Sequence, residues 1–121
     1  MRILKFCFLI ALGMFITQPA SAAPRAVDFS GYTWTVKSGY GGPGGNNWGN
    51  GEESVFVDSA GKLHLKVKNI GGKWYSSEVF LNKSLGYGKY EFVTEGPVDK
   101  VDKNLVVGLF VYADDEHEID I

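Results

Sequence analysis

The chain has very little cysteine and histidine. Its single cysteine, Cys7, lies near the N-terminus, before a predicted cleavage point after Ala22. The exported chain is therefore expected to form no disulfide and to carry no lipid-modified N-terminal cysteine. The two histidines, His64 and His117, do not have the spacing of a zinc site. We expect neither a bound cofactor nor a resident transition metal.

No apolar run is long enough to span a bilayer, which takes about 20 residues. The run at residues 6–16 follows Arg2 and Lys5 and precedes the small-x-small pattern of residues 20–22 (Ala-Ser-Ala). This arrangement predicts a cleaved signal peptide over residues 1–22, with an uncleaved anchor as the alternative. The protein is expected to be exported, extracellular or periplasmic, and free of the membrane after cleavage.

Basic residues are not in excess. Removing Arg2 and Lys5 leaves 10 basic against 14 acidic residues, a formal charge of −4, and five of the acids fall within residues 114–120. This balance argues against nucleic acid or an anionic membrane surface as a partner. A neutral polymer suits the charge better, and no protein partner is implied.

A convincing 3.6-residue period is missing beyond residue 22, whereas period-2 alternation is common. Residues 55–57 and 62–68 predict a hairpin closed by the turn at residues 58–61, and Gly71-Gly72 predicts a second turn. Further strands are predicted at 73–81, 87–93, 105–112 (buried on both faces) and 116–121. These strands predict one all-β domain within residues 23–121, an antiparallel sandwich or jelly roll.

Residues 39–51 contain seven glycines and are predicted to be a loop. Gly39, Gly41 and Gly44 match a dinucleotide-binding spacing, but no strand-to-helix context surrounds them, so nucleotide binding is not expected. The glycines favour close passage of the backbone past a bulky group. Trp48, flanked by asparagine and glycine, is predicted to lie outside the core.

Two acids, Glu118 and Asp120, alternate with Ile119 and Ile121 at residues 118–121. On a strand both carboxylates face the same way, about 7 Å apart along the chain. Paired carboxylates of this kind serve glycoside hydrolysis, in which one attacks the sugar and another acts as acid and base. The alternatives are a solvated acidic edge strand and a calcium site formed by residues 114–116 (Asp-Asp-Glu).

The chain is rich in Tyr and Trp for its length. Flat rings with polar tips suit the faces of sugars, although most such rings pack in cores. The residues concerned are Tyr32, Trp34, Tyr40, Trp48, Trp74, Tyr75, Tyr87 and Tyr90.

Three segments resemble glycoside hydrolase family 16, the laminarinase and licheninase group. Residues 118–121 look like the start of its Glu-Ile-Asp-Ile-Glu signature, and residues 48–52 (Trp-Gly-Asn-Gly-Glu) are similar to its Trp-Gly-Asn-x-Glu loop. Residues 86–92 (Gly-Tyr-Gly-Lys-Tyr-Glu-Phe) resemble its Tyr-Gly-(Lys/Arg)-Tyr-Glu strand, after a Ser-Ser-Glu-Val-Phe-Leu segment. The resemblance implies a concanavalin A-like jelly-roll β-sandwich and a secreted, retaining β-glucanase acting on a polysaccharide.

By this resemblance Glu118 is the nucleophile, Asp120 is the assisting acid, and Trp48 and Glu52 line the sugar cleft. No residue matches the acid/base glutamate, and family domains are roughly twice this length. The chain is therefore expected to be roughly the N-terminal half of the domain and inactive as written, without reducing-sugar release. The alternative is a secreted, non-catalytic carbohydrate-binding module on the same scaffold.

Overall fold

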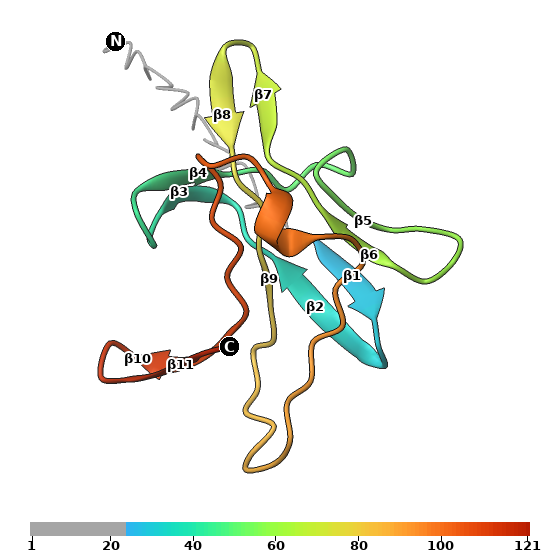
Figure 1. Cartoon of the computed structure of the whole chain (residues 1–121), viewed down its shortest axis with the longest axis vertical. Coiled ribbons are helices and arrows are strands. Elements are labelled where there is room, and N and C mark those ends of the chain that lie inside the picture. The colour runs from blue at the N-terminus through green and yellow to red at the C-terminus, as the bar shows by residue number, and fades with distance from the viewer. Residues whose placement is uncertain (1–23) are drawn as a thin grey trace, which may run out of the picture. The chain divides into compact units, whose positions relative to one another are not determined.

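The computed structural model describes residues 24–121 and shows a chain of short strands in small antiparallel sheets (Figure 1). These residues contain no α-helix, so the all-β prediction is confirmed. The predicted signal peptide, residues 1–22, lies outside the described residues. The described residues form two compact units, residues 24–83 and residues 84–121.

Within residues 24–83 there are nine strands. They are β1 (Ala26–Phe29), β2 (Tyr32–Val36), β3 (Gly39–Gly41), β4 (Asn46–Trp48), β5 (Val55–Val57), β6 (Leu63–Leu65), β7 (Lys68–Ile70), β8 (Lys73–Tyr75) and β9 (Val79–Phe80). β1, β2 and β9 form a three-stranded sheet, and the other six pair as the hairpins β3–β4, β5–β6 and β7–β8. The pairs β1–β2, β3–β4, β5–β6 and β7–β8 join consecutive strands, because a short turn is enough to bring two such strands side by side.

The hairpin predicted from residues 55–57 and 62–68 is confirmed, but its second strand is shorter than predicted and ends at Leu65. β5 and β6 pair antiparallel with Val55 opposite Leu65. The side chain of Asp58 organises the turn, because its Oδ1 accepts hydrogen bonds from the amides of Ala60 and Lys62, both at 2.9 Å. An aspartate that bonds to backbone amides a few residues further on is typical of such turns.

The turn predicted at Gly71-Gly72 is also confirmed, with φ values of 60° and 83° that favour glycine. The single strand predicted at residues 73–81 is instead divided into β8 and β9. The division falls at Ser76, whose backbone pairs in parallel with Trp48 rather than continuing either sheet. The Ser76 amide donates to Asn47 O at 2.8 Å, and its carbonyl accepts from Gly49 N at 2.9 Å.

The prediction that residues 39–51 are a loop is wrong for their first ten residues, which contain the hairpin β3–β4. Gly44 and Gly45 supply positive φ values of 70° and 66° at its turn. The expected close approach of the backbone occurs at Gly49. A Cβ there would lie 3.2 Å from Tyr75 Cβ and 3.4 Å from Ser54 Oγ. The glycine-rich composition therefore reflects a tight hairpin and a crowded crossing.

The buried core of residues 24–83 is small. Among the described residues its fully or nearly fully buried apolar side chains are Val36, Trp48 and Val55. Ser54 is also fully buried, and its Oγ has no hydrogen-bond partner within residues 24–121. Leu65 on β6 is half exposed. The strands therefore leave much apolar surface uncovered.

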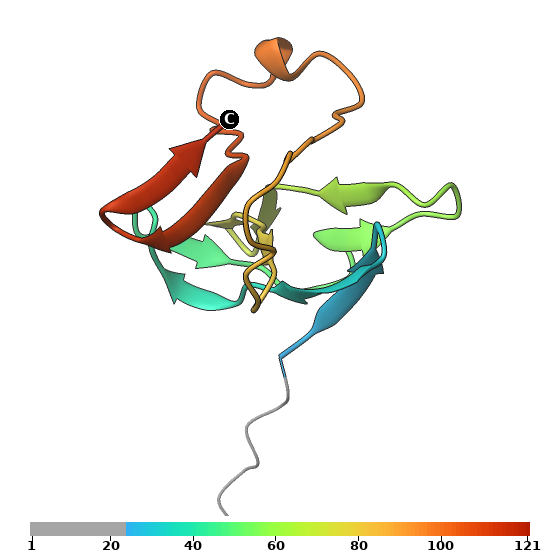
Figure 2. The same cartoon turned by 90° about the horizontal axis from the view of Figure 1, so that it is seen from below.

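Residues 84–121 contain the short 3₁₀ helix η1 (Val98–Lys100) and two strands, β10 (Phe110–Asp114) and β11 (His117–Asp120). The two strands form an antiparallel hairpin (Figure 2). The strand predicted at 116–121 is confirmed as β11. The strand predicted at 87–93 is wrong, and only the end of that predicted at 105–112 is a strand, with Val106 95% exposed. A strand needs a neighbouring backbone to pair with, and no described segment forms a sheet with residues 87–93 or 105–108.

Candidate active site

The two predicted catalytic acids lie on β11, in the register that strand alternation requires. Glu118 is opposite Tyr112 and Asp120 is opposite Phe110, while Ile119 is opposite Val111. Residues opposite each other in an antiparallel pair share a face. One face of the hairpin thus carries Glu118, Asp120 and two aromatic rings, and the other carries Val111 and Ile119. Both acids are exposed.

A hydrogen bond holds the Tyr112 hydroxyl beside the turn of this hairpin. The hydroxyl donates to Asp115 Oδ1 at 2.8 Å. That bond is the main cause that raises the pKa of Tyr112 above its usual 10.0, followed by partial loss of water and the negative charges of Asp115, Asp114 and Glu118. The acid face is therefore electronegative, which favours neutral or cationic ligands over anionic ones.

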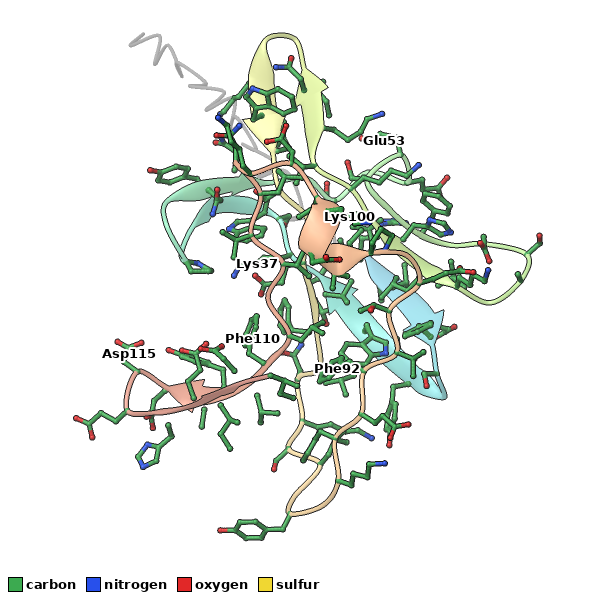
Figure 3. All side chains as sticks on the ribbon, in the orientation of Figure 1. Lys37, Glu53, Phe92, Lys100, Phe110 and Asp115 are labelled. Atoms are coloured by element: carbon green, nitrogen blue, oxygen red, sulfur yellow. The ribbon has the colours of Figure 1, made fainter. Side chains whose placement is uncertain are left out.

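Acids at the hairpin tip bond to neighbouring groups of the hairpin. Asp114 Oδ1 lies 2.6 Å from His117 Nδ1 and accepts from the amide of Glu116 at 3.0 Å. Asp115, labelled at the tip of the hairpin in Figure 3, accepts the hydrogen bond from Tyr112. Within residues 24–121, no three His, Cys, Asp or Glu side chains are gathered as a metal ion requires. His117 is partnered by Asp114 and exposed.

Trp48 is buried, and the prediction that it lies outside the core is wrong. Only 8% of its surface is exposed, and its Nε1 donates to Gly41 O at 3.2 Å. The Lys37 ammonium lies 4.3 Å from the centre of its ring. A parallel bridge joins Trp48 to the backbone of Ser76, a residue far along the chain. The polar residues on either side of Trp48 in the sequence do not indicate this contact. Its predicted sugar-binding role stays a prediction.

Lys37 also forms an ion pair with Glu78. Its Nζ lies 2.8 Å from Oε2 and 3.0 Å from Oε1, with side-chain exposures of 26% for Lys37 and 15% for Glu78. The Lys37 backbone amide donates to Glu78 O at 3.0 Å. Lysine, glutamate and indole thus form one partly buried cluster, the Lys37 cluster. Sequence reasoning did not predict it, because 41 residues separate the two charges.

Glu52 is exposed in the turn that precedes β5. It lines a shallow, open depression of about 330 Å³. The other lining residues are Arg25, Val27, Asp28, Phe56 and Val57. Trp48 is not among them, so the structure does not bring the two predicted cleft residues to one depression. Glu52 and Trp48 belong to residues 24–83, whereas Glu118 and Asp120 belong to residues 84–121.

Two exposed aromatic side chains are better placed for ligand contact than Trp48. Trp74 on β8 is 64% exposed and Tyr40 on β3 is 76% exposed. Asn47 Nδ2 donates to Trp74 O at 3.2 Å, which joins β4 to β8 beside this residue. A signal was present in the sequence, since Trp74 follows closely on a Gly-Gly turn and so lies near a hairpin tip.

A histidine and an aspartate form a second polar pair on β5–β6. His64 Nε2 lies 2.8 Å from Asp58 Oδ2, and the His64 ring stacks on Phe56 with 4.5 Å between centroids. The hydrogen bond with His64 is the main cause that lowers the pKa of Asp58, followed by the bond from the Lys62 amide. Within residues 24–121, no serine or cysteine side chain is hydrogen-bonded to this pair.

Comparison with protein-family models found no match, and comparisons with curated proteins and with solved structures found none either. Among residues 24–121 there is no helix with the length and apolar character needed to cross a membrane.

Proposed function

We propose that this chain is part of a secreted, retaining glycoside hydrolase of the family 16 type that cleaves a β-glucan. One observation carries the proposal: Glu118 and Asp120 share one exposed face of β11, opposite Tyr112 and Phe110. The sequence resemblances at residues 48–52 and 86–92 support it. The reaction needs carboxylates and water, so we propose no cofactor.

In the proposed reaction Glu118 attacks the anomeric carbon and forms a glycosyl-enzyme, which water then hydrolyses. Asp120 is the assisting acid, because like-charge repulsion and hydrogen bonding between neighbouring carboxyls adjust their protonation. The acid/base is a third carboxyl, the second glutamate of the family signature. The electronegative face, with Asp114 and Asp115 nearby, disfavours a sulfated polysaccharide and favours a neutral glucan.

We also propose that these strands belong to a larger jelly-roll β-sandwich and that residues 1–22 direct export. The small antiparallel sheets and the half-exposed Leu65 and fully exposed Val106 support the larger sandwich. Apolar side chains and unpaired strand edges of this kind are normally covered by further strands.

The first test is to read the coding sequence beyond the codon for Ile121. A glutamate one or two positions on, followed by further alternating strands, supports the enzyme. A stop codon directly after Ile121 removes the enzyme proposal and leaves the binding alternative.

The second test measures reducing-sugar release from laminarin and mixed-linkage β-glucan by the protein so encoded. Glu118→Gln is expected to lower kcat at least about a thousandfold, because a nucleophile is lost. Glu116→Gln, a charge-matched control in the exposed turn, is expected to keep activity. Product of retained anomeric configuration, observed by NMR, supports the double displacement. Undiminished activity in Glu118→Gln removes this residue from the nucleophile role.

The exposed Trp74 and Tyr40 favour a second candidate, a non-catalytic carbohydrate-binding module. Exposed indole and phenol rings stack on sugar faces. This candidate predicts that the protein migrates more slowly in native gels that contain β-glucan, and that Trp74→Ala abolishes the retardation. Tyr87→Ala is the control and is expected to keep the retardation, since Tyr87 is fully exposed but belongs to the other unit. Retardation without hydrolysis supports the module, and equal mobility with and without glucan removes it.

A further inference from the structure

Asn50-Gly51 is the one asparagine-glycine pair in the sequence. Asparagine in this context can react with the backbone of the next residue, since glycine has no side chain to hinder the approach of its nitrogen to the asparagine side chain. Asn50 is exposed, in the short segment between the buried Trp48 and the turn that leads into β5. Its side chain is therefore open to water, and the following residue, Gly51, is half-buried.

Hydrogen bonding separates Asn50 from the other five asparagines. Every other asparagine side chain in residues 24–121 has a hydrogen bond, and that of Asn50 has none. The bonded side chains are those of Asn46, Asn47, Asn69, Asn82 and Asn104. The Gly51 amide likewise donates no hydrogen bond to the described residues. Both reacting groups are thus free to meet.

Arg25 influences which product this reaction of Asn50 gives. Its Nη1 donates to the backbone carbonyl oxygen of Asn50 at 3.1 Å, and its Nη2 donates to Val55 O at 2.7 Å. A guanidinium at a carbonyl oxygen draws electrons from the carbonyl carbon and stabilises negative charge that develops on the oxygen. The carbonyl carbon of Asn50 is therefore the more electrophilic of the two carbons that water can attack after ring closure.

We propose that Asn50 is a site of spontaneous deamidation and that Arg25 directs the product to isoaspartate. The Gly51 nitrogen attacks Cγ of Asn50, the Cγ–Nδ2 bond breaks, and ammonia leaves with the proton of the Gly51 amide. Water then opens the resulting succinimide. Attack at Cγ gives aspartate. Attack at the backbone carbonyl carbon breaks its bond to the Gly51 nitrogen and gives isoaspartate, whose new carboxylate contains the oxygen that Arg25 already binds.

The test follows the purified full chain during incubation at neutral pH. Peptide mass spectrometry detects replacement of an amide NH₂ by a hydroxyl, and an isoaspartyl-specific methyltransferase with labelled methyl donor counts isoaspartate. Asn50 is expected to convert before the other five asparagines. Gly51→Ala is expected to slow conversion about two- to fivefold, the factor that corresponds to the conformational restriction of alanine relative to glycine. The three atoms nearest to the added Cβ all belong to the carboxylate of Glu53, which Figure 3 shows on the loop before β5 and which can move into solvent.

Conversion of Asn50 no faster than that of Asn104, or an unchanged rate in Gly51→Ala, overturns the site. The role of Arg25 has a separate readout, the ratio of isoaspartate to aspartate. This ratio is expected to be higher in the folded chain than in the same chain in urea, and to fall in Arg25→Met while ammonia release continues. Equal ratios in buffer and urea overturn the directing role even if Arg25→Met fails to fold.

Discussion

Replacing Glu78 with glutamine is expected to destabilise residues 24–83 by about 2 kcal/mol, because the Lys37 cluster then keeps a partly buried ammonium without its carboxylate. Both carboxylate oxygens of Glu78 accept from Lys37 Nζ, at 3.0 and 2.8 Å. Hydrogen bonds to charged groups contribute about 1.5–3 kcal/mol each, and the remaining solvent exposure reduces that gain. The Trp48 ring, 4.3 Å from Nζ, retains about 0.5–1 kcal/mol of cation–π attraction.

Urea unfolding followed by tryptophan fluorescence measures this cost. With a slope of about 1–2 kcal/mol per molar urea, the midpoint is expected to fall by about 1 M or more. Lys37→Met is expected to cost a similar amount. The double variant removes both charges, so its cost is expected to be smaller than the sum of the single costs by about 1–2 kcal/mol.

Glu53→Gln is the matched control, since it removes an exposed carboxylate from the same unit and is expected to change stability by less than about 0.5 kcal/mol. If the costs of Glu78→Gln and Lys37→Met simply add, within about 0.5 kcal/mol, the two side chains do not interact as described. A cost for Glu78→Gln no larger than that of the control leads to the same conclusion.

Three further predictions concern pH and packing. The pKa of Asp58 is lower in the folded chain than its usual 3.8. Its contribution to stability is therefore present above pH 3.8 and is lost as the pH falls through the lowered value. Asp58→Asn should make the urea unfolding midpoint depend less on pH in a series of acidic buffers. Asp115→Asn removes the main cause of the raised Tyr112 pKa, so the alkaline titration of tyrosinate absorbance, measured against Tyr112→Phe, should move down towards 10.0; an unmoved titration contradicts the hydrogen bond. Gly49→Ala should cost about 1–3 kcal/mol because its Cβ meets neighbours at 3.2 and 3.4 Å, whereas Gly41→Ala, with nothing within 4 Å, should be near neutral in the same urea assay; equal costs contradict the crowding.

Local features of the fold could be predicted from the sequence because short-range rules decide them. The alternation around Leu63 and the turn at residues 58–61 were enough to place the β5–β6 hairpin, and Gly71-Gly72 marked the β7–β8 turn. The same alternation put Glu118 and Asp120 on one face of β11, since strand geometry alone decides which side chains face the same way.

Features that depend on a distant partner could not be predicted. Residues 87–93 alternate like a strand, yet no described segment pairs with them, so their pattern produces no sheet. Trp48 has the neighbours of a loop residue but is buried, because a parallel bridge to Ser76, 28 positions away, holds β4 against the segment after β8.

By itself, the sequence determined the all-β character, the turns and the shared face of the two carboxylates, because hydrogen bonds and side-chain directions within a few residues decide them. Only the tertiary structure decided that Trp48 is covered and that Lys37 meets Glu78. Burial and charge pairing depend on which backbone segments lie side by side, and residues far apart in the chain determine that together.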